Sequence, residues 1–376
     1  NIKSIKKLPI KKIKGKTVTL GDLGEIKYGP VSEKTLFKAQ SPDVLNENTV
    51  GIGIYARTNE STVTLSNNIR KKIEEVKQDW FTKEMILFCF EGWGDLLIEP
   101  KILKWIRKYF LEPKLVTPKT VAIICAGNVP MVGFHDIISG YLSGHKLLVK
   151  LSTDDNVLIP AVVDLMKKFD ENLATQIIFE NNKLSKFDAV IATGSNNTSR
   201  YFQDYFGKYP NIIRKSRTSI AVLDGSESED DLENLSKDVF TYFGLGCRNV
   251  TKLFLPQNFN LDQLFKGFYQ SKDVINNNKY ANNYDYHKAI FLLENFKILE
   301  NGFILLKEDE ALFSPIGTLY YEFYDNLDNL EKLIDNQIHS IQCRVGVNGI
   351  PFGKAQKPEL WDYADNVDTI NFFKSI

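Results

Sequence analysis

Clusters of cysteine and histidine are missing from this sequence of 376 residues. The four cysteines lie far apart and form no CxxC pair, and the four histidines are isolated from one another. The sequence therefore predicts no metal site and no disulfide framework. We expect free, reduced thiols, as in a cytoplasmic protein.

An excess of one charge and long apolar runs are also missing. Lysine plus arginine and aspartate plus glutamate both number 47, which argues against a nucleic-acid-binding protein. Apolar runs such as VAIICAG are far shorter than the ~20 residues of a membrane span. The first residues, NIKSIKKLPIKKIKGK, are basic but lack the apolar segment of a signal peptide. We expect a cytoplasmic protein with no nucleic-acid partner and no membrane span.

A regular alternation of apolar strands and amphipathic helices begins near Thr117. Strand-like runs are separated by helical segments and end in glycine, serine or asparagine; they are KTVAIICAG, KLLVKLS, TQIIFE, FDAVIATGS and RTSIAVLD. This order predicts right-handed crossovers and a doubly wound parallel sheet. Ligands of such sheets bind at the carboxyl ends of the strands. A nucleotide-binding domain is therefore expected.

Four regions are predicted from these patterns. They are a β-rich extension (1–65), a helical layer with the nucleotide-binding α/β domain (66–224), a second α/β domain carrying Cys247 (225–345), and a tail that packs back on the fold (346–376).

Cys247 is the strongest candidate for a catalytic side chain. It lies in FGLGCRNVTKLFLP, where Gly244 and Gly246 permit a tight turn that leaves the thiol open to a substrate. Arg248 and Lys252 would favour the thiolate, which is the attacking form. The alternative is a buried cysteine that acts as a small hydrophobic residue, as is expected of Cys125.

Polar residues follow three of the predicted strands. Asn128 either stabilises an oxyanion or caps the next helix. Lys150 and Ser152 suit a nucleotide ribose, although a lysine at a strand end is more often solvated. Gly194 and Ser195 open a helix, a common arrangement for binding phosphate. The usual GxGxxG dinucleotide motif is absent.

In this order, the segments resemble the aldehyde dehydrogenase superfamily, and specifically its LuxC-type acyl-CoA reductases, the fatty-acid reductases linked to bacterial luciferase. The blocks that carry the resemblance are AGNVPMVGFHDIISGYLSGHKLLVKLSTDD, FDAVIATGSNNTSRYF, NIIRKSRTSIAVLDG and TYFGLGCRNV. The resemblance implies an α/β fold with two doubly wound parallel-sheet domains, one for the cofactor and one for catalysis, behind an N-terminal helical and β extension.

The resemblance also implies a role for each candidate. Cys247 falls on the catalytic cysteine, Asn128 on the oxyanion asparagine, and Lys150 with Ser152 on the pair that contacts the adenosine ribose. Gly194 and Ser195 fall on the pyrophosphate-binding glycine and serine. Glu310 or Glu308 falls on the glutamate that holds the nicotinamide ribose.

Two departures from the superfamily bear on the reaction. Ile213 stands where oxidising aldehyde dehydrogenases have the glutamate that activates water, which favours thioester chemistry over hydrolysis. Thr153 stands where NAD-preferring members often have a glutamate, which favours NADPH. Asp154 and Asp155 nearby leave NADH open.

The predicted function is therefore NADPH-dependent reduction of an acyl thioester, a fatty acyl-CoA or a carrier-bound acyl group, to the aldehyde through an acyl-enzyme on Cys247. The resemblance also implies a homo-oligomer and a partner enzyme that supplies the acyl group. The alternatives are an oxidising NAD(P)-dependent aldehyde dehydrogenase and a non-catalytic scaffold of an acyl-processing complex.

Overall fold

The computed structural model describes residues 9–13, 16–19, 71–76, 79–109 and 117–376. The chain divides into two compact units, residues 1–66 and residues 67–376. In the first unit, strands β1 (Pro9–Ile13) and β2 (Lys16–Thr19) form an antiparallel pair. The remaining β segments expected before residue 66 lie outside the described residues.

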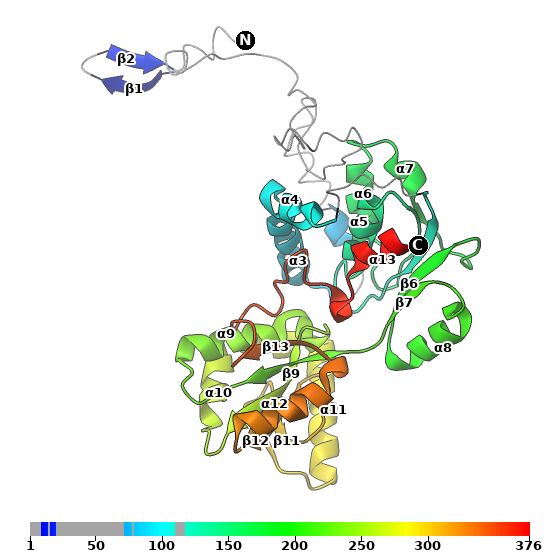
Figure 1. Ribbon diagram of the computed structural model, residues 1–376. Coiled ribbons are helices and arrows are strands. Elements are labelled where there is room, and N and C mark those ends of the chain that lie inside the picture. Colours follow the sequence, from blue (N-terminus) through cyan, green and yellow to red (C-terminus); the bar gives the residue numbers. More distant parts are fainter. Residues whose placement is uncertain (1–8, 14–15, 20–70, 77–78, 110–116) are drawn as a thin grey trace. The chain divides into compact units, whose positions relative to one another are not determined.

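Five parallel strands form the first sheet of the second unit, in the order β5-β4-β3-β6-β7. Of these strands, β6 and β7 are labelled in Figure 1. The five strands are β3 (Thr120–Ile124), β4 (Lys146–Lys150), β5 (Ile177–Phe179), β6 (Ala189–Thr193) and β7 (Asn211–Arg214). Their helices are α5 (Phe134–Leu142), α6 (Leu158–Met166), α7 (Leu173–Gln176) and α8 (Asn196–Phe206). Side chains of α8 pack on one face of the sheet, against Ala122, Val190 and Ala192.

Six strands form the second sheet, in the order β10-β11-β12-β9-β8-β13. All neighbours in this sheet are parallel except β10 with β11. The strands are β8 (Thr218–Val222), β9 (Val250–Pro256), β10 (Ile298–Glu300), β11 (Leu305–Glu308), β12 (Thr318–Tyr324) and β13 (Ile341–Gly346). The prediction of two mostly parallel α/β sheets is confirmed.

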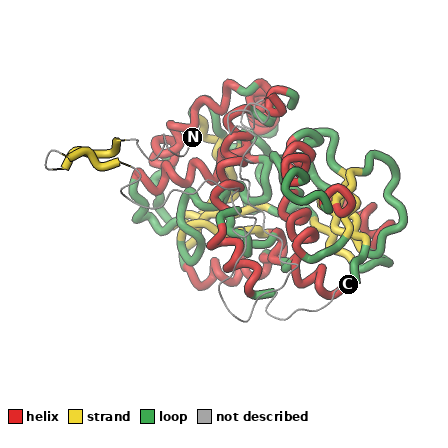
Figure 2. Tube along the Cα trace, turned by 90° about the horizontal axis from the view of Figure 1, so that it is seen from above, coloured by secondary structure: helices red, strands yellow, loops and turns green. Residues whose placement is uncertain are grey.

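Helices cover both faces of this second sheet, because successive side chains of a strand point to opposite faces. Helices α9 (Glu229–Phe240) and α10 (Asp262–Phe268) pack on one core cluster, and α11 (Asn278–Leu293) and α12 (Leu327–Asn336) pack on the opposite face. Figure 2 shows the strands flanked by helices.

One strand was assigned to the wrong sheet. RTSIAVLD was expected to be the fifth strand of the first sheet, but it forms β8 of the second, and NIIR forms β7 instead. The passage between the sheets therefore lies between Arg214 and Thr218, before the expected boundary at Asp224. All residues of β8 are buried, so its sequence has no alternation that would indicate which sheet it joins.

The tail returns to the first half of the second unit. Helices α3 (Lys83–Leu96) and α4 (Glu99–Arg107) precede the first sheet, and α13 (Thr369–Ser375) ends the chain against α5. The indole of Trp105 donates to the Tyr363 hydroxyl (2.7 Å), which donates to the Tyr109 hydroxyl (2.7 Å). A buried hydrogen-bonded chain therefore joins α4 to the tail.

Within the described ranges, no helix combines the length and apolar character needed to cross a membrane.

Candidate active site

The segment Thr241–Asn249, which we call the nucleophile loop, connects α9 to β9 and contains Cys247. It begins with a turn of left-handed backbone: Tyr242, Phe243 and Gly244 have φ angles of 55°, 56° and 80°. Glycine adopts this conformation freely, whereas each of the two aromatic residues costs roughly 1–2 kcal/mol. Backbone strain of this kind persists only where surrounding contacts hold it.

Aromatic packing holds the left-handed turn in place. The Phe243 ring is buried between Trp80 and Tyr280, at centroid distances of 5.6 and 6.2 Å. The Tyr242 backbone N–H donates to Sδ of Met85 in α3 (3.3 Å). Burial of a large ring contributes about 1.5–3 kcal/mol, which offsets the strain.

Cys247 lies half-buried just beyond this turn. Burial raises the pKa of its thiol, and the nearby Arg248 guanidinium opposes that effect. The Ser219 hydroxyl donates to the Cys247 carbonyl (3.0 Å), and Arg248 donates to the Ala355 carbonyl (3.2 Å). The cation of Arg248 therefore partly offsets the effect of burial on the pKa of the Cys247 thiol.

Lys252 was expected to favour the same thiolate, and the structure assigns it elsewhere. Its side chain is fully buried in β9, where it donates to the Glu322 carboxylate (2.9 Å) and to the Asp309 carbonyl. Burial lowers the pKa of this ammonium group. The residue ties β9 to β12 and to the strand end after β11.

Asn128 lies in the loop after β3, and its exposed side chain reaches the nucleophile loop. Its Nδ2 donates to the Leu245 carbonyl (2.8 Å), two residues before Cys247. Met131 in the same loop has a positive φ of 56°, and its backbone N–H donates to the buried Asp155 carboxylate (2.6 Å). Asn128 and Cys247, 119 positions apart in the printed sequence, are therefore joined through one hydrogen bond to the nucleophile loop.

The carboxyl ends of β3 and β4 form a close backbone cradle. A Cβ on Gly127 would lie 2.5 Å from Oγ of Ser152, so only glycine fits there. Lys150 ends β4 and donates to the Asn182 carbonyl (3.2 Å). Thr153 and Asp154 are exposed beyond the cradle.

Gly194 and Ser195 lie at the carboxyl end of β6. The Ser195 hydroxyl accepts from the Thr198 backbone N–H (3.2 Å) and caps α8, whose first turn is exposed. The amino terminus of a helix attracts anions because its first N–H groups point outward. The cradle and this helix end therefore fit a dinucleotide phosphate chain lying along the carboxyl edge of the sheet.

Glu308 and Glu310 are both exposed, one at the end of β11 and the other in the loop that follows. Within the described part of the chain, neither has a hydrogen-bond partner that would favour one over the other as the ribose-binding residue. Both remain predictions.

Arg214 is a site-proximal residue that the sequence analysis missed. It follows Ile213 in β7 and forms a buried bidentate ion pair with Asp136 of α5. Its guanidinium also lowers the pKa of Cys247, after the larger effects of burial and Arg248. A charged residue closing the apolar run NIIR is the signal that would have indicated it.

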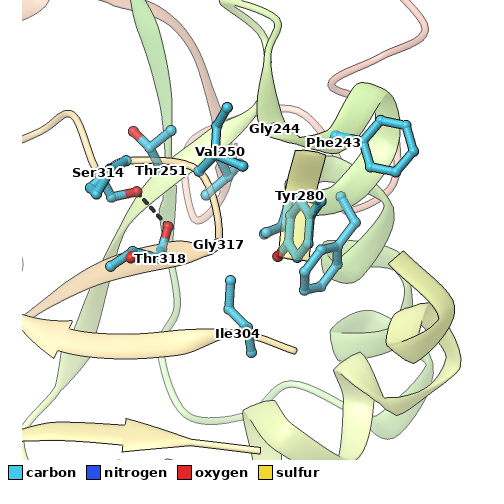
Figure 3. A pocket seen from close by; sticks show the side chains of 13 residues that line it. Phe243, Gly244, Val250, Thr251, Tyr280, Ile304, Ser314, Gly317 and Thr318 are labelled. Atoms are coloured by element: carbon cyan, nitrogen blue, oxygen red, sulfur yellow. Dashed lines mark hydrogen bonds between the residues drawn. The ribbon is translucent and has the colours of Figure 1, made fainter. Parts of the chain in front are cut away.

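A small pocket of about 20 Å³ lies behind the left-handed turn (Figure 3). Tyr280 and Phe243 line one side, and the Ser314 hydroxyl donates to the Thr318 carbonyl on the other (2.7 Å). Its volume is that of about one water molecule, and Cys247 is not among its lining residues. The aromatic residues Tyr280 and Phe243 that line it are buried and form part of the core.

Among the residues described, no three histidine, cysteine or acidic side chains come together as a group able to hold a metal ion.

The solved structures that this chain resembles in fold include aldehyde dehydrogenases. Betaine aldehyde dehydrogenase from Staphylococcus aureus matches with a TM-score of 0.52 and 11% identity, covering 79% of this chain and 73% of that one. Aldehyde dehydrogenase 21 from Physcomitrella patens matches with a TM-score of 0.52 and 11% identity, covering 76% and 72%. The NAD-dependent aldehyde dehydrogenase from Sinorhizobium meliloti matches with a TM-score of 0.50 and 10% identity, covering 60% of this chain. This chain spans only about half of that protein, 54%.

The chain therefore shares the fold of these aldehyde dehydrogenases. Residues 96–263, which include Asn128, Lys150, Ser195 and Cys247, match the family model described as acyl-CoA reductase (LuxC). This segment is therefore similar to the LuxC-type acyl-CoA reductases, as the sequence blocks predict. No curated protein matches the chain.

Proposed function

We propose that this protein reduces an acyl thioester, a fatty acyl-CoA, to the aldehyde with NADPH, through an acyl-enzyme on Cys247. The observation that carries the proposal is the hydrogen bond from Asn128 to the Leu245 carbonyl. It holds an exposed amide donor beside the loop of a half-buried thiol flanked by a cation. A nucleophile next to an oxyanion donor is the arrangement that acyl transfer needs.

In the first step, the Cys247 thiolate attacks the thioester carbonyl and the CoA thiolate leaves. The oxyanion of the tetrahedral intermediate would accept hydrogen bonds from the Cys247 backbone N–H and from the second N–H of the Asn128 amide. The first N–H of that amide is held by Leu245. Loss of one such donor typically lowers the rate by ~10²–10³.

The cofactor would lie along the carboxyl edge of the first sheet. Gly127 and Ser152 would form its cradle, Lys150 would bind its ribose, and the amino terminus of α8 at Ser195 would bind its phosphates. A bound nicotinamide supplies the hydride that takes the acyl group to the aldehyde level.

The preference for NADPH rests on the residues that follow β4. Thr153 is neutral and exposed, and the carboxylate of Asp155 is buried against the Met131 backbone N–H. Asp154 is thus the one carboxylate of this segment, residues 150–155, that is exposed to repel a 2′-phosphate. NADH is the alternative donor.

The acyl-enzyme would survive in water because β7 offers no base. Ile213 occupies the position that the resemblance assigns to the water-activating glutamate, and its neighbour Arg214 is paired with Asp136. A CoA or carrier-bound donor, a homo-oligomer and an acyl-supplying partner enzyme stay predictions of the family resemblance.

The test is oxidation of NADPH, followed by absorbance, with a panel of acyl-CoAs and with direct detection of the aldehyde. Cys247→Ala should abolish turnover, whereas Cys343→Ala, a second half-buried thiol, should retain it. Formation of NAD(P)H from aldehydes without any thioester turnover would instead assign the protein to the oxidising branch. Binding of acyl-CoA without turnover in either direction would indicate a scaffold.

A further inference from the structure

Asn249 lies two residues after Cys247, at the end of the nucleophile loop, and its side chain is fully buried. Its Nδ2 donates to the carbonyl of Thr241 (2.7 Å). The same nitrogen lies within hydrogen-bonding distance of the carbonyls of Val239 (3.1 Å) and Asp238 (3.2 Å). One amide group therefore supplies hydrogen-bond donors to carbonyls at the end of α9 that have no partner within the helix.

The other end of the same amide faces the nucleophile loop. Oδ1 of Asn249 accepts from the Gly246 backbone N–H (2.8 Å), directly before Cys247. The Asn249 backbone N–H donates in turn to the Gly246 carbonyl (3.0 Å). The residue that precedes the nucleophile is thus bonded to Asn249 through both of its peptide groups.

The left-handed turn lies between these two attachments. Thr241 precedes Tyr242, and Gly246 follows Gly244 by two residues, so the Asn249 amide bridges both ends of the turn. Among the described residues, no other side chain hydrogen-bonds to both ends of the turn. Because a strained turn relaxes unless its ends are held, Asn249 determines where the loop beyond it lies.

We propose that Asn249 is a positioning residue that fixes the Cys247 thiol relative to Asn128. This rests on the function proposed above. Leu245, the residue whose carbonyl accepts from Asn128, lies between the turn and Gly246. The Gly246 N–H donates to Asn249 and is therefore not available to the oxyanion. The next backbone donor along the chain is the Cys247 N–H.

The space around Gly246 supports this role. A Cβ there would lie 3.0 Å from Oδ1 of Asn249 and 3.5 Å from a methyl group of Val129, the neighbour of Asn128. The loop is therefore confined between the Asn249 amide on one side and the Asn128 segment on the other. A small displacement of the loop changes the distance from thiol to oxyanion donor.

The principal test uses Asn249→Ala, with two measurements that should move in opposite directions. The kcat for acyl-CoA reduction should fall by ~10²-fold, the effect of about 1 Å of misplacement, with the KM for NADPH unchanged. Alkylation of Cys247 by iodoacetamide, located by mass spectrometry, should become faster at neutral pH. Release of the loop exposes the thiol and removes the burial that raises its pKa.

The matched control is Asn301→Ala, in the same half of the unit. The Asn301 side chain accepts from the backbone N–H groups of Phe303 (3.3 Å) and Ile304 (3.2 Å), far along the chain from Cys247. This variant should lose thermal stability without a change in kcat or in the pH profile of alkylation. If Asn249→Ala behaves in the same way, Asn249 is structural only and the proposal is overturned.

Gly246→Ala keeps the proposal testable if Asn249→Ala does not fold. Its added methyl group would lie against Oδ1 of Asn249. We therefore expect a lower kcat and faster alkylation of Cys247, each changed less than in Asn249→Ala. Unchanged kcat and alkylation in this variant would overturn the proposal. If the wild type reduces no acyl-CoA, the proposed function fails, and the alkylation profiles still decide whether Asn249 positions Cys247.

Discussion

The guanidinium of Arg214 and the carboxylate of Asp136 form a buried bidentate ion pair, with N–O distances of 2.5 and 2.9 Å. Arg214 also donates to the Thr369 hydroxyl (3.2 Å). The pair therefore joins the end of β7 to α5 and to α13. The Arg214 cation also lowers the pKa of the Cys247 thiol.

Removal of one partner should destabilise the protein strongly. Asp136→Asn leaves a buried guanidinium without its counter-charge, which typically costs about 3–5 kcal/mol. The double variant Asp136→Leu/Arg214→Met should be less destabilised than Asp136→Asn, because no charge then stays buried alone. Urea unfolding followed by circular dichroism measures both. Equal stability of wild type and Asp136→Asn would contradict this account of the pair.

Replacement of the oxyanion amide should affect the rate rather than cofactor binding. Asn128→Ala should lower kcat for acyl-CoA reduction by ~10²–10³ and leave the KM for NADPH unchanged. The melting temperature should change little, because the Asn128 side chain is exposed. A loss confined to the KM for NADPH would assign Asn128 to cofactor binding instead.

The four thiols should differ in reactivity towards iodoacetamide. Cys247 and Cys343 are half-buried, whereas Cys89 and Cys125 are buried, and burial raises the pKa of Cys89 to about 12. Mass spectrometry of the folded protein should find label on the first two alone. Because the pKa of Cys247 is raised, its labelling should keep accelerating above the pH at which an ordinary cysteine ionises.

A variant of Arg248 tests what determines the pKa of Cys247. The Arg248 cation lowers the pKa of Cys247, so Arg248→Met should raise that pKa and slow labelling of Cys247 at neutral pH. The effect should reach about tenfold if the shift is one unit. Faster labelling in this variant would show that Arg248 shields the thiol rather than favouring its ionisation.

Asp155 should make the protein less stable as the pH rises. Burial raises its pKa from 3.8 to about 6, and its Oδ1 has no hydrogen-bond partner among the residues that the structure describes. Between these two values the folded state holds more protons than the unfolded state, so stability falls with rising pH and the loss is complete above about pH 6. The full loss is at most about 3 kcal/mol.

Asp155→Asn keeps the acceptor for the Met131 N–H and removes the buried charge. It should therefore unfold at higher urea than wild type near pH 8 and at similar urea near pH 4. The control is Asp164→Asn, a largely exposed carboxylate that should show no such difference. A wild-type advantage near pH 8 would show that the charge of Asp155 is compensated.

The sequence predicted β3, β4, β5 and β6 of the first sheet, because each of these apolar runs is bounded by glycine or polar residues, but it did not predict β7. It predicted β8 as a strand but not its sheet, since an entirely buried strand has no polar face. Two candidate site residues could be predicted from local sequence: Cys247, because it follows glycine in a loop, and Asn128, because it follows the end of a strand. The left-handed backbone at Tyr242 and Phe243 could not, because neither residue type favours a positive φ.

The residues that hold the site could not be found from local patterns. Asn249 follows the cysteine as an ordinary polar residue, and its importance comes from carbonyls at the end of a helix that precedes it. Arg214 lies 78 positions from its partner Asp136. Such contacts depend on tertiary structure that a single sequence does not display.

The chain passes between the two sheets at Lys215–Arg217 and again in the tail after β13, and an ion pair joins the two crossings. Nε of Arg217 lies 3.2 Å from the Asp365 carboxylate. A single chain connection would let the two sheets rotate relative to each other about any axis. Two adjacent connections that are joined by an ion pair restrict this rotation to one axis. Any rotation of the first sheet relative to the second would therefore involve Lys215, Ser216 and the Asp365 segment together, because the Arg217–Asp365 ion pair links the two connections.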